Sequence, residues 1–401
     1  MAKPLTVEVA IVGGGPAGLT VAIALAEAGI ETALIARRPA PDHRTTALLA
    51  GSVTALKTLG VWDGCEAQAA PLRVMQIVDA TARLVRAPEV RFAASEIGLD
   101  AFGHNIENRH LMAALDIRAP KLTSLSRIDD EARAVETADP CVTVSLKGGD
   151  RIAARLVIGA DGRRSLCRTA AGIESDGRAY PQTALTFNLA HTRSHHDTST
   201  EFHTESGPFT LVPLPSKRSS LVCVVEPAEA ERIAALDDVA LNDEIEQRSH
   251  SILGKVTAEP GRGVFRLAVE TVRTFGQNRI ALVGEAAHLI PPIGAQGLNL
   301  GLRDAACIGE LVVSAARDGG DVGAPDLLAR YDTQRRADVK SRTLAVDLLN
   351  RTLLTDFLPV QSARGVGLYL IDRIGPLRRA VLREGVAPAA SQPRLMRGEA
   401  L

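Results

Sequence analysis

The chain has 401 residues, of which 46% are hydrophobic and 23% are charged, and its formal net charge at pH 7 is −1. This length exceeds one ordinary hydrophobic core, so two domains are expected, and the composition is that of a soluble globular protein. A net charge so close to zero argues against a polyanionic partner such as nucleic acid.

The cysteines and the N-terminus predict a cytoplasmic protein. The five cysteines form neither a CxxC pair nor a spacing typical of metal ligands, so reduced thiols are expected. The first residues lead almost directly into an apolar strand, without the basic and apolar regions of a secretory signal. No apolar run approaches the ~18 residues that a membrane span requires.

A complete βαβ unit is predicted at the start of the chain. Residues 6–12 are apolar and β-branched, as in a buried parallel strand, and residues 31–36 form a second strand. Between them, residues 19–28 are rich in Ala and Leu and predict a helix that Gly29 ends.

A glycine motif joins the first strand to this helix. Gly13 permits the tight turn, Gly15 lets the backbone approach a pyrophosphate, and Gly18 lets the helix pack on the strand. The N-terminus of the helix then offers free N–H groups and a positive dipole end to the phosphates. The motif predicts a dinucleotide site.

The end of the second strand departs from the usual dinucleotide pattern. A carboxylate is expected there to bind the adenosine ribose, but the position holds Ala36, followed by Arg37 and Arg38. An arginine can suit a 2′-phosphate, which would indicate NADP. The alternative is that water or backbone groups hold the ribose.

The middle of the chain changes character twice. Residues 44–62 predict a helix with its flanks, residues 108–115 a short helix, and residues 141–146 and 151–158 a β-hairpin. Residues 181–272 are then mostly β, a candidate second domain. Its predicted strands are 183–190, 209–214, 221–226 and 264–269.

A second motif lies at the end of the predicted strand 151–158. The strand runs into an Asp161-Gly162 turn and then into a helix that Ser165 and Arg168 help begin. On its own, this pattern is equally typical of an ordinary strand–turn–helix corner.

A third motif begins where residues 279–283 repeat the buried-strand pattern. Gly284 ends the strand, and Glu285 follows where its carboxylate can accept hydrogen bonds from sugar hydroxyls. Pro291 and Pro292 then stiffen the chain before a long helix, predicted over residues 297–316, which is rich in small residues. Such a helix can approach a flat ring, and its positive N-terminus favours an anionic reduced flavin.

In this order, the three motifs resemble the FAD-dependent aromatic hydroxylase superfamily, which includes p-hydroxybenzoate hydroxylase. The chain is most similar to the ubiquinone-biosynthesis hydroxylase family, through almost its whole length and above all through Gln296-Gly297-Leu298-Asn299-Leu300-Gly301-Leu302-Arg303-Asp304. An α/β fold is therefore expected, with a Rossmann-like FAD-binding domain built from separated segments, a β-rich substrate domain and C-terminal helices. The expected segments are 1–75, 101–178 and 273–330 for the FAD-binding domain, 76–100 and 179–272 for the substrate domain, and 331–401 for the helical region.

The resemblance also implies the residues that bind FAD. Arg44 and Arg109 match arginines of the family that contact FAD, and Asp161 resembles the aspartate of its DG motif, linked to flavin and nicotinamide binding. Glu285 stands where the family usually has Asp, and Ala36 where it usually has Glu, so both departures bear on the affinity and pose of FAD. The full set of candidate cofactor-binding residues is Gly13, Gly15, Gly18, Arg37, Arg44, Arg109, Asp161, Gly284, Glu285, Pro292, Gly297, Leu298 and Asn299.

The same resemblance implies the reaction. NADH or NADPH reduces FAD after transient docking, O₂ adds to the reduced flavin as a C4a-hydroperoxide, and its distal oxygen attacks a phenol ring, here a polyprenylated phenol of ubiquinone biosynthesis. Pro292, Gly294 and Gln296 are the candidate catalytic residues by their place in the flavin loop, and no acid or base residue is assigned. His288 is expected to be structural, and no metal site is expected.

Two other functions remain open. A protein of this fold could hydroxylate a soluble aromatic compound or a xenobiotic. A non-catalytic flavoprotein that acts as an assembly partner is the other alternative, which Ala36 and Glu285 suggest.

The C-terminal region carries 12 Lys and Arg against 7 Asp and Glu over residues 331–401. Either these helices rest on an anionic membrane face or a biosynthetic complex, with the protein peripheral on the inner side of the membrane, or they cap the substrate domain and the arginines face water. The apolar residues concerned are Leu348, Leu349, Leu353, Leu354, Phe357, Leu358, Val366, Leu368, Tyr369, Leu370 and Ile371. The interleaved arginines are Arg351, Arg364, Arg373, Arg378, Arg379 and Arg383.

Overall fold

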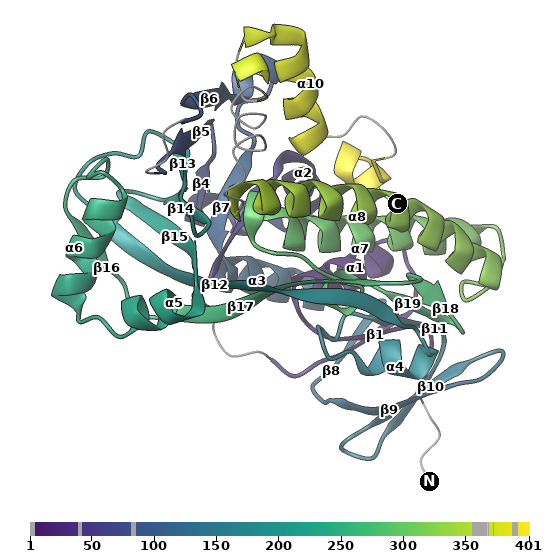
Figure 1. The fold of residues 1–401 in the computed structure, drawn as a ribbon. Coiled ribbons are helices and arrows are strands. Elements are labelled where there is room, and N and C mark those ends of the chain that lie inside the picture. Colours follow the sequence, from purple (N-terminus) through teal and green to yellow (C-terminus); the bar gives the residue numbers. More distant parts are fainter. Residues whose placement is uncertain are drawn as a thin grey trace.

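The computed structural model describes residues 5–38, 42–81, 86–354, 367, 369–371, 373–386 and 392–401. Its first layer is a sheet with a parallel centre (Figure 1). In spatial order the parallel strands are β19 (Ile280–Leu282), β11 (Arg151–Gly159), β1 (Leu5–Val12), β2 (Thr32–Ile35) and β8 (Leu125–Ile128). The predicted βαβ unit is therefore confirmed, with α1 (Pro16–Glu27) between β1 and β2.

Three short strands extend this sheet. β18 (Gly276–Gln277) pairs antiparallel with β19, and β9 (Ala132–Thr137) pairs with β10 (Val142–Leu146). The predicted hairpin is confirmed, since β10 pairs antiparallel with the first half of β11 while the second half of β11 pairs with β19.

Helices pack on the parallel sheet through small side chains. α7 (Gln296–Arg317) and α3 (Asn108–Arg118) both contact α1. A Cβ added to Gly309 of α7 would lie 3.8 Å from the Cβ of Ala24 in α1, so the two helices approach closely. Because β1 and α1 are apolar throughout their inner positions, they bury almost completely in the largest core of the protein.

The second layer is a mostly antiparallel sheet, in which β13 and β5 alone among the described neighbours pair parallel. Its strands are β20 (His288–Leu289), β17 (Gly263–Val272), β12 (Ser175–His191), β15 (Arg218–Val225), β14 (Pro208–Leu214), β13 (Thr198–His203), β5 (Val74–Asp79) and β6 (Val90–Ala93), and β16 (Val256–Ala258) pairs with β12. One face packs on α5 (Pro227–Ala234) and α6 (Asp238–Arg248) through a core that includes Phe187, Phe202 and Leu221. The opposite face carries Ala184, Val224 and Leu267.

The prediction for residues 44–62 is only partly correct. The helix α2 covers Ala50–Thr58, but it is preceded by a strand, β3 (Thr45–Leu49). β3 pairs with β7 (Gly103–Glu107), which also pairs with β4 (Ala69–Pro71) in a small third sheet. A β-branched pair, Thr45 and Thr46, begins the strand, and its partner lies about 60 residues away, beyond the reach of a local pattern.

The C-terminal helices lie over both layers. α8 (Pro325–Leu354) packs on α7, and α10 (Gly375–Val386) contacts the turn at residues 94–97 after β6 (Figure 1). None of the helices among the described residues has the length and apolar character needed to cross a bilayer. β5 and β6 join the antiparallel sheet, while β12 begins four residues before the expected boundary at 179, and the domain limits themselves stay predictions.

Candidate cofactor and substrate site

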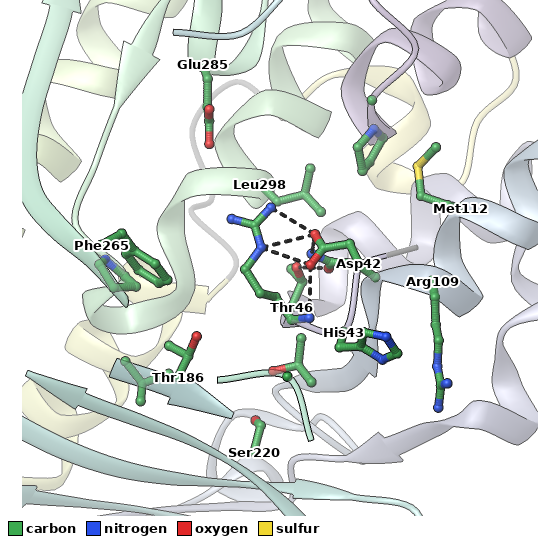
Figure 2. A pocket seen from close by; sticks show the side chains of 18 of the residues that line it. Asp42, His43, Thr46, Arg109, Met112, Thr186, Ser220, Phe265, Glu285 and Leu298 are labelled. Atoms are coloured by element: carbon green, nitrogen blue, oxygen red, sulfur yellow. Dashed lines mark hydrogen bonds and ion pairs between the residues drawn. The ribbon is translucent and has the colours of Figure 1, made fainter. Parts of the chain in front are cut away.

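A cavity of about 890 Å³ borders both sheets. Its lining comes from the β1–α1 turn, the loop before β3, α3, the inner face of the antiparallel sheet, and residues 285–298. Figure 2 shows Glu285 at one end of this space and Thr186 and Ser220 at the other, with Asp42 and Leu298 between them. The cavity thus connects the glycine turn to the face of the second sheet.

The three glycines of the turn have different roles. Gly13 has a φ of +114°, and a Cβ there would lie 2.2 Å from the carbonyl oxygen of Ala160. A Cβ on Gly18 would lie 2.0 Å from the carbonyl oxygen of Gly13. A Cβ on Gly15 would meet no atom within 4 Å, and Gly15 lines the cavity. Two glycines therefore allow close packing, and the third leaves space at the N-terminus of α1, which no side chain caps.

The arginines expected to contact FAD line the same cavity, and each has a carboxylate partner. Arg44 donates from Nε and Nη2 to the two carboxylate oxygens of Asp42, at 2.9 and 2.8 Å. Burial alone would raise the pKa of Asp42, but hydrogen bonds from Arg44 and Asn108 hold it below its usual value. Arg37 lies 3.3 Å from Glu131. A diphosphate that binds here would compete with these carboxylates for the arginines.

Arg109 is held by a carboxylate that also reaches the second sheet. Its Nη2 lies 2.7 Å from Oε2 of Glu107, a side chain that is only 3% exposed. Oε1 of Glu107 accepts from Asn188 Nδ2 of β12 at 2.8 Å and from Arg218 Nη2 of β15 at 3.1 Å. Burial would raise the pKa of Glu107, but Arg109 and Arg218 hold it lower. The roles of Asp42, Glu107 and Asn188 were not predicted, although two acids each stand two positions before an arginine.

The DG motif lies beside the glycine turn, outside the cavity lining. Oδ1 of Asp161 accepts from the hydroxyl of Ser165 at 2.6 Å, and Oδ2 accepts from the backbone N–H of Cys167 at 3.1 Å. Ser165 caps α4 (Leu166–Ala171) by accepting from the N–H of Arg168, as expected. These bonds give Asp161 a structural task, and a direct contact with FAD stays a prediction.

The loop after β19 supplies the other end of the cavity. Gly284 has a φ of +61° and donates its N–H to Oδ2 of Asp304 at 3.0 Å, which leaves Glu285 exposed toward the cavity. Pro292 and Leu298 line the cavity as well. The remaining loop residues, Gly294, Gln296, Gly297 and Asn299, are not among the residues that line the cavity, so their contacts with flavin stay predictions.

Asn299 fastens the loop to distant backbone. Its Oδ1 accepts from the N–H of Leu49 at 2.8 Å and from the hydroxyl of Ser52 at 2.7 Å. Its Nδ2 donates to the carbonyls of Ala47 and Ala295 at 2.8 and 2.6 Å. With both side-chain atoms used, Asn299 positions the loop against β3 and α2.

His288 belongs to a buried ionic cluster rather than to the cavity lining. Its Nε2 lies 2.6 Å from Oδ2 of Asp304, whose Oδ1 accepts from Nε of Arg335 at 2.6 Å. Asp304 is fully buried. Burial would raise its pKa, but His288 and Arg335 hold it below the usual value. These contacts fit the structural role expected for His288.

The antiparallel sheet presents a neutral face to the cavity. The side chains on this face that line the cavity are Thr186, Asn188, Ser220, Val222, Phe265 and Leu267. By strand alternation Arg266, which also borders the cavity, belongs to the opposite face. Thr186 Oγ1 is buried and has no hydrogen-bond partner among the described residues. Such a surface suits an uncharged ring.

A glycine turn on a parallel sheet, facing a cavity that reaches a second, antiparallel sheet, defines a dinucleotide-binding protein of the Rossmann-like class. The family described as an FAD binding domain matches residues 6–344. Ubiquinone hydroxylase UbiL of Rhodospirillum rubrum is 35% identical over 402 residues, which cover 98% of this chain and 92% of that protein. The 3-demethoxyubiquinol 3-hydroxylase of Escherichia coli is 34% identical over 389 residues, which cover 94% of this chain and 97% of that protein.

Solved structures show the same fold. p-Nitrophenol 4-monooxygenase from Pseudomonas putida superposes with a TM-score of 0.79 at 19% identity, over 96% of this chain and all of that chain. HpxO of Klebsiella pneumoniae, solved with FAD and uric acid, gives 0.72 at 20% identity, over 94% and 96% of the two chains. The chain therefore belongs to the FAD-dependent aromatic hydroxylases, in the group that includes the ubiquinone-biosynthesis hydroxylases. It is a flavin-dependent monooxygenase.

Proposed function

We propose that this enzyme hydroxylates the ring of a neutral, polyprenylated phenol in ubiquinone biosynthesis, with FAD as cofactor, NADH or NADPH as reductant and O₂ as oxidant. The observation that carries the proposal is the single cavity that joins the glycine turn to the neutral face of the antiparallel sheet. Relatives named as ubiquinone hydroxylases, which align with nearly the whole chain, support the choice of substrate.

The residues present fit FAD. Gly15 leaves space for a diphosphate at the N-terminus of α1, and Arg44 and Arg109 bring positive charge to it. Glu285 would accept hydrogen bonds from ribityl hydroxyls, and Pro292 and Leu298 would border the ring. When bound, the flavin supplies the redox chemistry, since it accepts electrons from the nicotinamide and activates O₂.

The protein's own contribution is to place and isolate the ring of the substrate. Phe265, Leu267 and Val222 give the inner end of the cavity an apolar wall, and the hydroxyls of Thr186 and Ser220 are polar groups there that a phenol can reach. The side chains of this face that line the cavity are uncharged. The enzyme is therefore expected to prefer uncharged phenols over benzoates.

We also propose that α10 rests on an anionic lipid surface, where polyprenylated phenols partition. Ile374, just before the helix, and Leu377 and Val381 within it are exposed apolar residues that alternate with exposed Arg379 and Arg383. Each cation near such a surface contributes about 1 kcal/mol. Tyr369 and Leu370, just before α10, are exposed too.

Part of the C-terminal region caps the second sheet instead. Leu382 is buried and Ile371 packs with it in a core that includes Phe92 and Phe102. Arg378 donates from Nη2 to Oε1 of Glu96 at 3.0 Å, a contact that fits the alternative in which this region caps the substrate domain. Phe357, Leu358, Arg364, Val366 and Leu368 lie outside the described residues, and of Leu349, Arg351, Leu353 and Leu354 only the backbone in α8 is described.

The test of the catalytic proposal uses the purified yellow holoenzyme. A short-chain prenylphenol should stimulate NAD(P)H oxidation and yield a product heavier by one oxygen, by mass spectrometry with ¹⁸O₂. The same assay with a soluble carboxylated phenol is the control. Bound FAD without any phenol-stimulated oxidation would contradict the proposal and favour an assembly partner, and preference for the carboxylated ring would favour a soluble substrate.

Co-sedimentation with vesicles tests the lipid proposal. Binding to phosphatidylglycerol vesicles should be strong at low salt and weaken as salt screens the arginines, whereas phosphatidylcholine vesicles should bind little. Replacing Arg373, Arg379 and Arg383 by Gln should remove the salt-sensitive part. Equal binding to both kinds of vesicle, or to neither, would contradict it.

A further inference from the structure

Arg342 of α8 contacts the flavin loop directly. Its residue is only 8% exposed, and its Nη1 lies 3.1 Å from Oε1 of Gln296, the first residue of α7. Nε2 of Gln296 in turn donates to the carbonyl of Gly294 at 2.9 Å. One side chain of α8 is thus linked, through a single amide, to the backbone of the loop that holds Pro292 at the cavity.

This loop needs such support. Gly294 and Ala295 both adopt left-handed backbone angles, with φ of +67° and +54°. The left-handed conformation is unfavourable for Ala, because its Cβ crowds the backbone, so contacts around it must hold the conformation. Asn299 holds the carbonyl of Ala295, and Gln296 holds that of Gly294. Arg342 fixes the second of these two supports.

The same guanidinium reaches the end of α10. Nη2 and Nη1 of Arg342 lie 3.4 Å from the carbonyl oxygens of Glu384 and Gly385, in the last turn of that helix. Free carbonyls and the negative end of the helix dipole both favour a cation there. Arg342 therefore contacts the flavin loop and the proposed lipid-binding helix at once.

The ion pair of Arg342 leaves some of its N–H groups for Gln296 and for the carbonyls at the end of α10. Asp338 accepts from Nε of Arg342 at 2.9 Å, and also from Arg303 and Arg335. Together with Asp304, two carboxylates meet three guanidinium groups in this cluster. Arg342 is the member whose remaining N–H groups go to neutral oxygen atoms.

We propose that Arg342 is a positioning residue that transmits the docking of α10 on an anionic lipid surface to the flavin loop, and so sets how efficiently oxygen is transferred. Coupled turnover consumes NAD(P)H, a proton and O₂, places one oxygen atom on the ring and releases the other as water. Uncoupled turnover consumes the same reactants and releases both oxygen atoms as H₂O₂. Displacement of the flavin loop favours uncoupled turnover, with release of H₂O₂. This inference rests on the proposed function.

A double-mutant cycle tests the link to the loop. Arg342→Ala and Gln296→Ala should each raise H₂O₂ formed per NAD(P)H several-fold, and the double variant should be no worse than the worse single variant, since both break one connection. Arg342→Lys should restore part of the coupling. Arg336→Ala is the matched control, because Arg336 lies on the same helix, half-exposed, and pairs with Asp332. Additive effects, or a wild-type H₂O₂ ratio in Arg342→Ala, would overturn the inference.

Vesicles test the link to α10 and separate this inference from the function. Phosphatidylglycerol vesicles should change the visible flavin spectrum of the wild-type holoenzyme and lower its H₂O₂ ratio, and should do neither in Arg342→Gln, whose vesicle binding persists. An unchanged wild-type spectrum with bound vesicles overturns the link. Failure of the wild-type enzyme to hydroxylate any phenol contradicts the proposed function instead. The visible flavin spectrum still tests whether Arg342 links α10 to the flavin loop.

Discussion

Two glycines of the phosphate turn make a matched pair of substitutions. Gly15→Val should fold normally, since Gly15 has an ordinary extended conformation and no atom lies near its Cβ position, but the new side chain would occupy the space for the diphosphate. The variant is expected to be colourless, with a free energy of unfolding of the apoprotein within about 0.5 kcal/mol of wild type. Gly13→Val should fail to fold, because its Cβ would clash with the carbonyl of Ala160. If Gly15→Val retains its full flavin content, the phosphate-binding site does not lie at Gly15.

The missing ribose carboxylate gives a gain-of-affinity prediction. A Cβ on Gly14 would lie 2.5 Å from the Cβ of Ala36, so position 36 adjoins the turn that would hold the adenosine half of FAD. Ala36→Glu should restore hydrogen bonds to ribose hydroxyls and tighten FAD binding by roughly 10-fold, since such a bond to a charged group contributes about 1.5 kcal/mol. Fluorescence titration of the apoprotein measures the change. Ala36→Gln is the control, and weaker binding in Ala36→Glu would place the ribose elsewhere.

A fully buried carboxylate, that of Asp304 in α7, pairs with Arg335 of α8. Asp304→Asn keeps the shape of the side chain but removes one of the two carboxylate charges that pair with buried Arg335. The free energy of unfolding should therefore fall by about 3–5 kcal/mol. Because the pKa of Asp304 is lowered in the folded state, its contribution is present above the unfolded value of about 3.9 and is lost as pH falls through the lower folded value. Urea unfolding measured from pH 7 downward should show this loss of stability in acid for the wild-type protein and not for Asp304→Asn. Asp318→Asn, at an exposed position, is the control and should change the free energy of unfolding little. If both variants lose stability equally, the buried ionic cluster is not the cause.

The elements also show which features could be predicted from the sequence. The βαβ unit, the hairpin and α7 follow from local periodicity and glycine placement, and each was located within a few residues. β3 was missed because its strand character depends on pairing with β7. Asn299 was assigned to flavin by its motif, yet its bonds go to Leu49 and Ser52, about 250 residues earlier, and no local pattern contains them. The contact of Arg378 with Glu96, 282 residues earlier, also lies outside any local pattern.

Over the whole molecule, Glu107 joins the FAD-binding side to the substrate side. One buried carboxylate holds Arg109 of the cavity, Asn188 of β12 and Arg218 of β15. Glu107→Gln should cost about 2 kcal/mol of stability and loosen both sides together, so FAD and a phenol ligand should each bind more weakly. Isothermal titration of both ligands measures the two losses. Glu259→Gln removes the other carboxylate on Arg218 without touching Arg109, so it should leave FAD affinity unchanged. If Glu107→Gln weakens only one ligand, the two sheets are not coupled through this residue.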